Sequence, residues 1–452
     1  MYILKREIPL NEDYDVLVAG GGPAGCTAAA AAAREGARVL LLESGGCLGG
    51  MATAGLVTSW APFSDGEKLV YRGMAQTILE RAKAPLRHIP PDMVDWVPID
   101  VEHLKRVYDD FLAEYGVGVR FNTMLVGADT DASGRVEAVI AANKAGLTAY
   151  RAKVYIDCTG DADLAAYAGG TFQPDVQEEP MPATLCFVLA NVDTYAYLYD
   201  PQYGQLTVGG ILASANPHSF VHRLPQDDRF PHIVDTHLCN DLIGPGVVAF
   251  NAGHVFAVDA TDPACVSRAI ATGRVIAGEF CRALALYFPQ AFGNAFLVET
   301  APAMGIRESR RIAGEYTLTL EDYYRRASFA DEISRNCYYL DKHYTRQELE
   351  LLRQGKIDEQ AQWANYGKGE SHGIPYRCLL PVGLENVLVA GRTVSCEKRL
   401  QSSLRVMPSC LAMGEAAGTA AAQAAATDGN VHAVDTAALR RRLRECGGYI
   451  LG

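Results

Sequence analysis

The stretch DVLVAGGGPAG at residues 15–25 contains the strongest fold signal in the chain. Residues 15–19 predict a short buried strand, and the alanine-rich run that follows the glycines predicts a helix to Arg34. Gly36 supplies a stop for this helix, and residues 38–42 predict a second buried strand. A strand, a tight turn, a helix and a second strand in this order form a parallel βαβ unit.

The residues of this turn suit a dinucleotide site. Gly20 permits the tight turn, Gly22 lets the backbone approach a pyrophosphate, and Gly25 lets the helix pack on the strand. The helix that starts at Pro23 and Ala24 then presents free N–H groups and a partial positive charge to the phosphates. An alternative is a glycine-rich turn in an unrelated α/β domain.

The residues after the second strand favour FAD over NAD. Glu43 lies 18 residues beyond Gly25, where a carboxylate can accept hydrogen bonds from the ribose hydroxyls. The glycine-rich stretch SGGCLGGMATAG follows at residues 44–55, where an NAD domain would continue with another βα unit. Thr53 is a candidate donor to the cofactor, and capping of a following helix is its alternative role.

Composition limits the class of protein. The 452 residues are enough for two or three domains, and 49% apolar with 21% charged residues is typical of globular proteins. A net charge of -12 argues against nucleic-acid or anionic-membrane partners. No apolar run reaches the length of a membrane span and no leader pattern is evident, so we expect a cytoplasmic protein. The 12 cysteines are scattered without a Cys-x-x-Cys pair, so no metal or iron–sulfur site is expected.

The remaining patterns predict a discontinuous cofactor domain. A helix is expected over 101–115, strands over 117–120, 125–127, 136–141 and 153–157, and a turn over 131–134. From about 180 to 370 the sequence has fewer glycine-rich turns, more tyrosines and more charged helices. Within this region, Asp262-Pro263 opens a long helix to about Tyr287. The end returns to a buried strand at 386–390 and a small-residue helix at 409–426, whose N-terminal end would face the flavin ring. The fold class is therefore α/β, with a Rossmann-like FAD-binding domain at 1–175 and 373–452 and an inserted α+β substrate or cap domain at 176–372.

Two groups of side chains are candidates for substrate chemistry. The stretch RESRRI at 307–312 contains Arg307 and Arg310, which could clamp an anion, whereas a salt-bridged surface is the competing interpretation. His254, in a glycine-containing loop, and His372 are candidate proton carriers, although each could be an uninvolved loop histidine. Tyr376 could donate a proton or pack in the core.

The chain resembles the FAD-dependent oxidoreductases of the "FAD oxidored" group, whose nucleotide domain is of the glutathione-reductase and fumarate-reductase type. The likeness spans nearly the whole chain, is thinnest from about 171 to 250, and is carried by GGGPAG at 20–25, Glu43, LGG at 48–50, Thr53, DCTGDAD at 157–163, RESRRI at 307–312, GEY at 314–316, IPYR at 374–377, VAGR at 389–392, RVMP at 405–408 and MGEAAG at 413–418. Cys26 stands where many relatives carry an aliphatic residue, and it suits a small apolar position facing the sheet.

The resemblance implies an FAD site and places Arg307, Arg310, Tyr376 and Arg377 near the junction of the flavin and substrate domains. The candidate catalytic residues are His254, His372, Tyr376, Arg307, Arg310 and Arg377. The candidate cofactor residues are Gly20, Gly22, Pro23, Ala24, Gly25, Glu43, Ser44, Gly49, Gly50, Thr53, Gly160, Gly391, Arg392, Arg405, Gly414 and Ala417.

We therefore expect an FAD-dependent dehydrogenase or reductase that acts on a small polar molecule. The alternatives are a flavin-dependent monooxygenase and an electron-transfer flavoprotein subunit that works with an iron–sulfur partner. An electron donor or acceptor protein stays open as a partner, as do the substrate, the direction of reaction, the oligomeric state and covalent attachment of the FAD.

Overall fold

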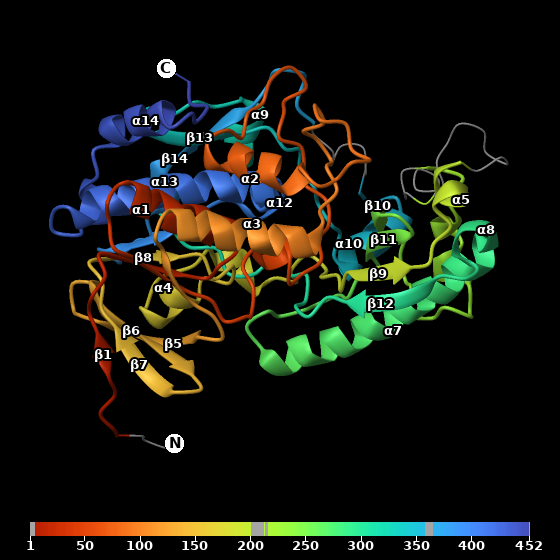
Figure 1. Cartoon of the computed structure of the whole chain (residues 1–452), viewed down its shortest axis with the longest axis horizontal. Helices are drawn as coiled ribbons and strands as arrows, with labels where there is room; N and C mark the ends of the chain where they lie inside the picture. The colour runs from red at the N-terminus through yellow and green to blue at the C-terminus, as the bar shows by residue number, and fades with distance from the viewer. Residues whose placement is uncertain (1–4, 200–211, 213–215, 358–364, 452) are drawn as a thin grey trace.

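A five-stranded parallel sheet forms the centre of the computed structural model, which describes residues 5–199, 212, 216–357 and 365–451 (Figure 1). The fold is mixed α/β. The strand order is β15-β8-β2-β3-β4, and every neighbouring pair is parallel. The strands are β2 (Val16–Ala19), β3 (Val39–Leu42), β4 (Gly118–Arg120), β8 (Val154–Asp157) and β15 (Val387–Val389). The apolar runs of β2 and β3 are buried throughout because both faces of this sheet are covered.

Alternate residues of β2 show what covers each face. Val16 and Val18 belong to a core cluster with the alanines of α1 (Pro23–Arg34), whereas Leu17 and Ala19 pack against a second sheet. This second sheet has the order β1-β7-β6-β5. Its strands are β1 (Leu10–Asn11), β5 (Met124–Thr130), β6 (Val136–Asn143) and β7 (Gly146–Tyr150).

The helix α1 packs tightly against α13 (Met407–Ala425), which joins the two ends of the chain (Figure 1). A Cβ at Gly418 would lie 2.0 Å from the carbonyl oxygen of Ala28, so this approach requires glycine. Close approach explains why both helices are rich in small residues. The other helices of this region are α2 (Met74–Lys83), α3 (Val101–Glu114), α4 (Asp163–Tyr167), α12 (Lys398–Leu404) and α14 (Thr436–Glu445).

A separate four-stranded antiparallel sheet, of order β10-β11-β9-β12, lies on the other side of the molecule (Figure 1). Its strands are β9 (Phe187–Ala190), β10 (Leu238–Gly244), β11 (Val247–Ala252) and β12 (Phe296–Thr300). The long helix α7 (Pro263–Tyr287) crosses this sheet and contributes Phe280 to a core with Phe187 and Phe250. The Asp262 side chain caps this helix by accepting from the N–H of Ala264 at 2.9 Å, as predicted.

Shorter elements complete the fold. The strands β13 (Glu332–Asn336) and β14 (His372–Pro375) pair in an antiparallel ribbon. The short helices are α5 (Thr194–Leu198), α8 (Pro289–Phe292), α9 (Leu320–Tyr324) and α10 (Arg346–Arg353), and the 3₁₀ turns are η1 (Gly50–Ala52), η2 (Pro174–Gln177), η3 (Phe220–His222), η4 (Leu224–Gln226), η5 (Tyr376–Leu379) and η6 (Val431–Ala433). Among the described residues, no helix combines the length and apolar character that a bilayer crossing requires.

Candidate functional site

The three glycines of the turn, Gly20, Gly22 and Gly25, suit their positions for different physical reasons. Gly20 has φ +96°, and a Cβ there would lie 2.4 Å from the carbonyl oxygen of Cys158. A Cβ at Gly25 would lie 1.8 Å from the carbonyl oxygen of Gly20, so the fold itself requires both glycines. A Cβ at Gly22 would meet no described atom within 4 Å. The turn is therefore open at Gly22, on the side that a ligand can reach.

The start of α1 is suited to an anion. Gly22 is the N-cap, Pro23 opens the helix, and no described side chain caps its first turn, which holds no acidic residue. Ala24 and Gly25 then carry N–H groups without partners inside the helix. Uncapped N–H groups and the positive end of the helix dipole are an anion site.

Glu43 lies at the end of β3, beside this turn. Its carboxylate accepts the N–H of Gly21 at 2.7 Å and that of Gly45 at 2.5 Å. The Ser44 hydroxyl is 3.4 Å from the same carboxylate. Two backbone donors hold this carboxylate in position, as a ribose acceptor requires.

The glycine-rich stretch after Glu43 folds back onto the turn. Gly49 and Gly50 have φ +96° and +52°, and the N–H of Gly49 donates to the carbonyl of Gly21 at 2.8 Å. Thr53 donates its hydroxyl to the carbonyl of Leu48 at 2.5 Å, so in this structure it secures the loop and does not start a following helix. The sequence pattern did not reveal that this hydroxyl has its hydrogen-bond acceptor within its own loop.

The C-terminal segment brings a cation to the same region. Gly391 follows β15 with φ +103°. Arg392 then donates to the carbonyl of Gly160 at 2.5 Å and to the carboxylate of Asp161 at 2.9 Å, and its Nη1 reaches the carbonyl of Ile306 at 3.1 Å. Arg392 thus links the turn after β8 to the segment that carries Arg307.

Two predicted cofactor residues of α13 occupy packing positions. A Cβ at Gly414 would lie 2.1 Å from the carbonyl oxygen of Ala24, and Ala417 is fully buried between helices. Close approach to α1 accounts for Gly414, and full burial in the core accounts for the small side chain of Ala417. The N-terminal end of α13 is different, because Val406 and Met407 line the cavity described next.

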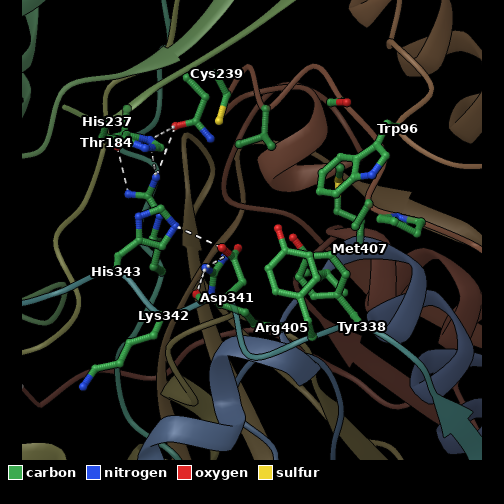
Figure 2. Close-up of a pocket in the computed structure, with 18 of the residues that line it drawn as sticks. Trp96, Thr184, His237, Cys239, Tyr338, Asp341, Lys342, His343, Arg405 and Met407 are labelled. Carbon is green, nitrogen blue, oxygen red and sulfur yellow. Dashed lines mark hydrogen bonds and ion pairs between the residues drawn. The ribbon is translucent and has the colours of Figure 1, made fainter. Parts of the chain in front are cut away.

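A cavity of about 1180 Å³ lies between the nucleotide-binding region and the antiparallel sheet (Figure 2). One wall comes from the glycine-rich stretch at residues 44–55 and from the C-terminal segment, and it includes Met51, Arg392, Arg405 and Met407. The opposite wall comes from the other sheet and from the segment after β13, and its polar members include His237, His254, Arg307, Asp341 and His343. In Figure 2, His237 and His343 lie across from Trp96, Tyr338 and Met407. Segments that are far apart in the sequence therefore line the same cavity.

Arg307, a predicted site residue, is fixed in this wall. It donates to the carbonyl of Pro182 and to the hydroxyl of Thr184, both at 2.8 Å, and to Nε2 of His237 at 3.1 Å. Burial lowers the pKa of Arg307 to about 10, which still leaves it charged at neutral pH. The guanidinium is a positioned cation in the cavity wall.

His254, the second predicted residue that the structure places in the cavity, belongs to a cluster of three histidines. Its Nδ1 is 2.7 Å from a carboxylate oxygen of Asp235, and its Nε2 is 2.9 Å from Nδ1 of His343. The ring of His237 is parallel to that of His254 within 2°, at 4.2 Å between centroids. Burial lowers the pKa of all three histidines, so the rings are neutral at neutral pH.

The fold brings together three potential ligand residues that the sequence spacing did not connect. One nitrogen from each ring lies within 4.8 Å of the other two, a separation compatible with a metal ion. However, the nitrogen lone pair lies in the ring plane, and one ion cannot lie in the planes of two parallel stacked rings. The Arg307 guanidinium also donates to His237. His237, His343 and Asp235 were missed because no regular spacing connects them.

The other predicted catalytic residues are not among the residues that line the cavity. Arg310 forms an ion pair with Asp163 at 2.6 Å, and Arg377 forms one with Asp331 at 3.0 Å. Tyr376 is buried and donates to the carbonyl of Val431 at 2.9 Å.

His372, also outside the cavity, is buried in β14 with Nδ1 2.5 Å from the Tyr366 hydroxyl, and burial lowers its pKa to about 3. Ion pairs account for Arg310 and Arg377, and core packing accounts for Tyr376 and His372. The sequence left these alternatives open for Arg310 and Tyr376, whereas His372 lies in a strand and not in a loop.

Arg405 does line the cavity, at the C-terminal end of α12 and just before α13. Its Nη2 lies 3.2 Å from a carboxylate oxygen of Asp341. The same carboxylate group lies 3.7 Å from Nε2 of His343. Arg405 thus connects the cofactor-side helix to the histidine cluster through Asp341.

Comparison with known proteins gives the family. The model of the FAD dependent oxidoreductase family matches residues 15–443. A search of the curated proteins found no match. Among solved structures, a geranylgeranyl bacteriochlorophyll reductase-like protein from Thermoplasma acidophilum is 14% identical, with 98% of this chain and 93% of that chain covered and a TM-score of 0.44.

Two further solved structures are also weakly similar to this chain. The flavin-dependent brominase Bmp2 is 14% identical, with 96% of this chain and 83% of that chain covered and a TM-score of 0.43. OxyS anhydrotetracycline hydroxylase from Streptomyces rimosus is 16% identical, with coverages of 67% and 54% and a TM-score of 0.37. Such weak similarity identifies no substrate. The family match is decisive, and the chain belongs to the FAD dependent oxidoreductase family as an enzyme whose cofactor is FAD.

Proposed function

We propose that this enzyme is a dehydrogenase or reductase that exchanges a hydride between FAD and a small polar organic substrate bound in the cavity. One observation carries the proposal: a single chamber is lined by the cofactor-side residues Met51, Arg392 and Met407 and by the polar residues Arg307 and His254 of the opposite wall. Residues 176–372, which supply that polar wall, are proposed as the substrate domain.

The residues beside the glycine turn fit FAD. The space over Gly22 is open, the start of α1 is uncapped by any described side chain, and the Glu43 carboxylate is held at the strand end. These features match the pyrophosphate and the ribose of the ADP half. When bound, FAD supplies a two-electron hydride acceptor. On the cofactor side of the cavity, the N-terminal end of α13 then provides partial positive charge, next to the Arg405–Asp341 ion pair.

The polar wall supports an oxygen-rich substrate. Arg307 is buried and charged. Its four Nη–H donors are used by Pro182, Thr184, His237 and Asn251, so it offers a substrate oxygen its fixed positive charge and its Nε–H. Two aromatic rings, Trp96 and Tyr338, lie across the cavity from His237 and His343 and pack edge to face at 6.1 Å between centroids (Figure 2). Trp96 is 47% exposed and has φ +54°, a rare conformation for a bulky residue. A polar anchor facing an apolar platform is typical of small-molecule sites.

The test is anaerobic mixing of the FAD-loaded enzyme with hydroxy acids, sugars and enoates, followed by the flavin absorbance. For oxidation substrates we expect bleaching, and for enoates we expect reoxidation of the prereduced enzyme. An Arg307→Met variant should keep its FAD and lose about 1.5–3 kcal/mol of substrate binding, which is the value of a charged hydrogen bond.

The control is Arg325→Met, because Arg325 is an exposed surface residue on the described chain and forms only a solvent-exposed ion pair. If no candidate changes the flavin spectrum, while NADH, oxygen and an aromatic compound are consumed together, the enzyme is a monooxygenase. Copurification of an iron–sulfur subunit that alone reoxidises the flavin would instead support an electron-transfer role.

A further inference from the structure

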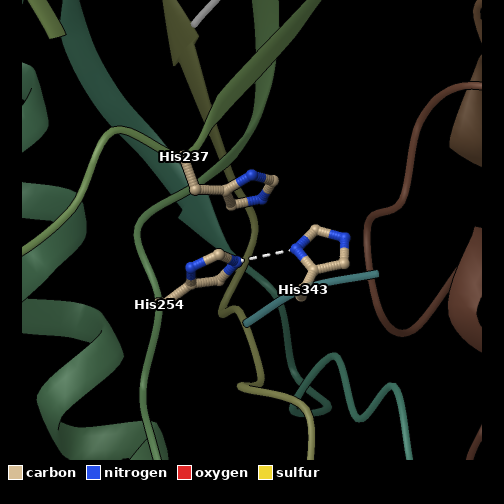
Figure 3. A group of neighbouring side chains, drawn as sticks. All are labelled: His237, His254 and His343. Carbon is tan, nitrogen blue, oxygen red and sulfur yellow. Dashed lines mark hydrogen bonds between the residues drawn. The ribbon is translucent and has the colours of Figure 1, made fainter. Parts of the chain in front are cut away.

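We propose that Nε2 of His343 is the proton acceptor of the substrate reaction, and that His254 and Asp235 are positioning residues that orient it. This inference rests on the proposed function, because it assigns the acid–base group of that reaction. The three side chains form a continuous chain of contacts in the cavity wall, and Figure 3 shows the His254–His343 contact.

The tautomers follow from these contacts. A carboxylate only accepts, so Nδ1 of His254 carries a proton and donates it to Asp235 over 2.7 Å. In a neutral His254 ring, Nε2 is then an acceptor. His343 must therefore donate to it from its own Nδ1, over 2.9 Å. Since His343 is also neutral, its Nε2 keeps a free lone pair.

That lone pair has a counterion nearby. The Asp341 carboxylate lies 3.7 Å from Nε2 of His343, too far for a hydrogen bond but close enough to stabilise an imidazolium. Arg405 forms an ion pair with Asp341 and holds it in place. Asp235 can stabilise the charge from the other end of the chain, through His254. This is the arrangement of nucleophile- or base-activating triads, with a second histidine in the terminal position.

His343 is uncharged at neutral pH before the reaction, so the lone pair of its Nε2 is available. Burial, followed by the charges of Arg307, the neighbouring His254 and Arg405, lowers the pKa of His343 well below the usual value. Burial raises the pKa of Asp235, but the contacts with His254, the hydrogen bond from the N–H of His237 and the charge of Arg307 together outweigh it, so the carboxylate is ionised. His237 stacks on His254 and is also neutral, because burial, followed by the charges of His254 and Arg307, lowers its pKa.

The proton balance is complete. In the oxidation of a hydroxyl substrate, the O–H bond breaks and its proton moves to Nε2 of His343. The C–H bond on the adjacent carbon breaks, its hydride passes to FAD, and the carbonyl bond forms. In the reverse direction His343 returns the proton. No further oxidant is required for this half-reaction.

The first experiment measures the tautomers and needs no substrate. In FAD-loaded enzyme with ¹⁵N-labelled histidine, long-range ¹H–¹⁵N spectra at neutral pH should show His254 and His343 as neutral rings protonated at Nδ1, with single-histidine variants giving the assignments. Protonation of His343 at Nε2 would overturn the inference. Elemental analysis should find less than stoichiometric metal, and one tightly bound ion per chain, released with loss of activity, would also overturn it.

The second experiment measures the rate of flavin reduction by a substrate found in the screen. His343→Ala should lower this rate by about 100-fold or more while FAD content and substrate affinity are kept. Added imidazole should restore part of the rate, which loss of structure would not allow. Asp235→Asn should shift the pH profile of the rate. The control is His218→Ala, an exposed histidine whose side chain is outside the cavity.

A wild-type rate in His343→Ala, or a loss that imidazole does not relieve, would refute the assignment of the base. The failure of every substrate to reduce wild-type flavin is a different result. It would refute the proposed function, while the tautomer measurement would still test the arrangement of His343 and His254.

Discussion

Changing Gly22 to alanine should weaken FAD binding and leave the fold intact. Gly22 has φ -71° and ψ -176°, which any residue adopts, and its Cβ would meet no described atom within 4 Å. The unfolding free energy without FAD should therefore change by no more than about 0.5 kcal/mol. With FAD bound, the methyl group would occupy the space where the pyrophosphate approaches the backbone. An overpacked contact costs about 1–3 kcal/mol, which raises the Kd for FAD by about 5- to 150-fold.

The matched comparison is Gly20→Ala. Its Cβ would lie 2.4 Å from a carbonyl oxygen, and its φ of +96° disfavours alanine, so this variant should lose stability even without FAD. The assay is titration of FAD into apoprotein, followed by fluorescence quenching, together with urea unfolding without FAD. Wild-type FAD affinity in Gly22→Ala, or unfolding of that variant as easily as Gly20→Ala, would refute the reasoning.

Three further predictions concern packing, a buried ion pair and pH. Gly418→Ala should lose about 1–3 kcal/mol of unfolding free energy, because its Cβ would lie 2.0 Å from a carbonyl oxygen. Gly278→Ala in α7 should gain up to about 1 kcal/mol, because the atom nearest to its Cβ among the described residues is 3.8 Å away. Urea unfolding in which both variants change stability in the same direction would contradict this. Arg311→Met should cost about 3–5 kcal/mol because it strands a buried carboxylate 2.7 Å away, and the exposed Arg325→Met at most about 1 kcal/mol; equal thermal shifts would argue against the distinction. Burial raises the pKa of Asp241 from 3.8 to about 7, so the folded state holds a proton that the unfolded state releases, and stability should fall as pH rises from about 4 to about 7. The Asp241→Asn variant should not show this decline. If urea unfolding shows that wild type and variant lose the same stability between pH 5 and pH 7, the prediction is wrong.

The local parts of the fold could be predicted from the sequence. The βαβ unit was expected at residues 15–42 and is present as β2, α1 and β3. The helix that Asp262 caps was expected to end at about Tyr287, where it does end. Capping, backbone freedom and apolar runs act within a few residues, so their signals are visible in the linear chain.

The pairing of distant segments could not be predicted in this way. β14 pairs with β13 across more than thirty residues and buries His372, which a loop position next to a family motif would have left available. Tyr376 follows in the same buried segment. A residue's distance from a motif along the chain therefore says little about its distance from the site.

For the cofactor half of the site, the sequence by itself determined the glycine turn and the acidic residue Glu43, because close backbone approach and a strand-end carboxylate are local requirements. Only the tertiary structure decided the substrate half. It brought His254 of one loop to His343 and Asp235 of others, and it placed Arg307 in the cavity while Arg310 entered an ion pair elsewhere. Burial and long-range contact set the protonation and orientation of these groups, and neither quantity exists until the chain has folded.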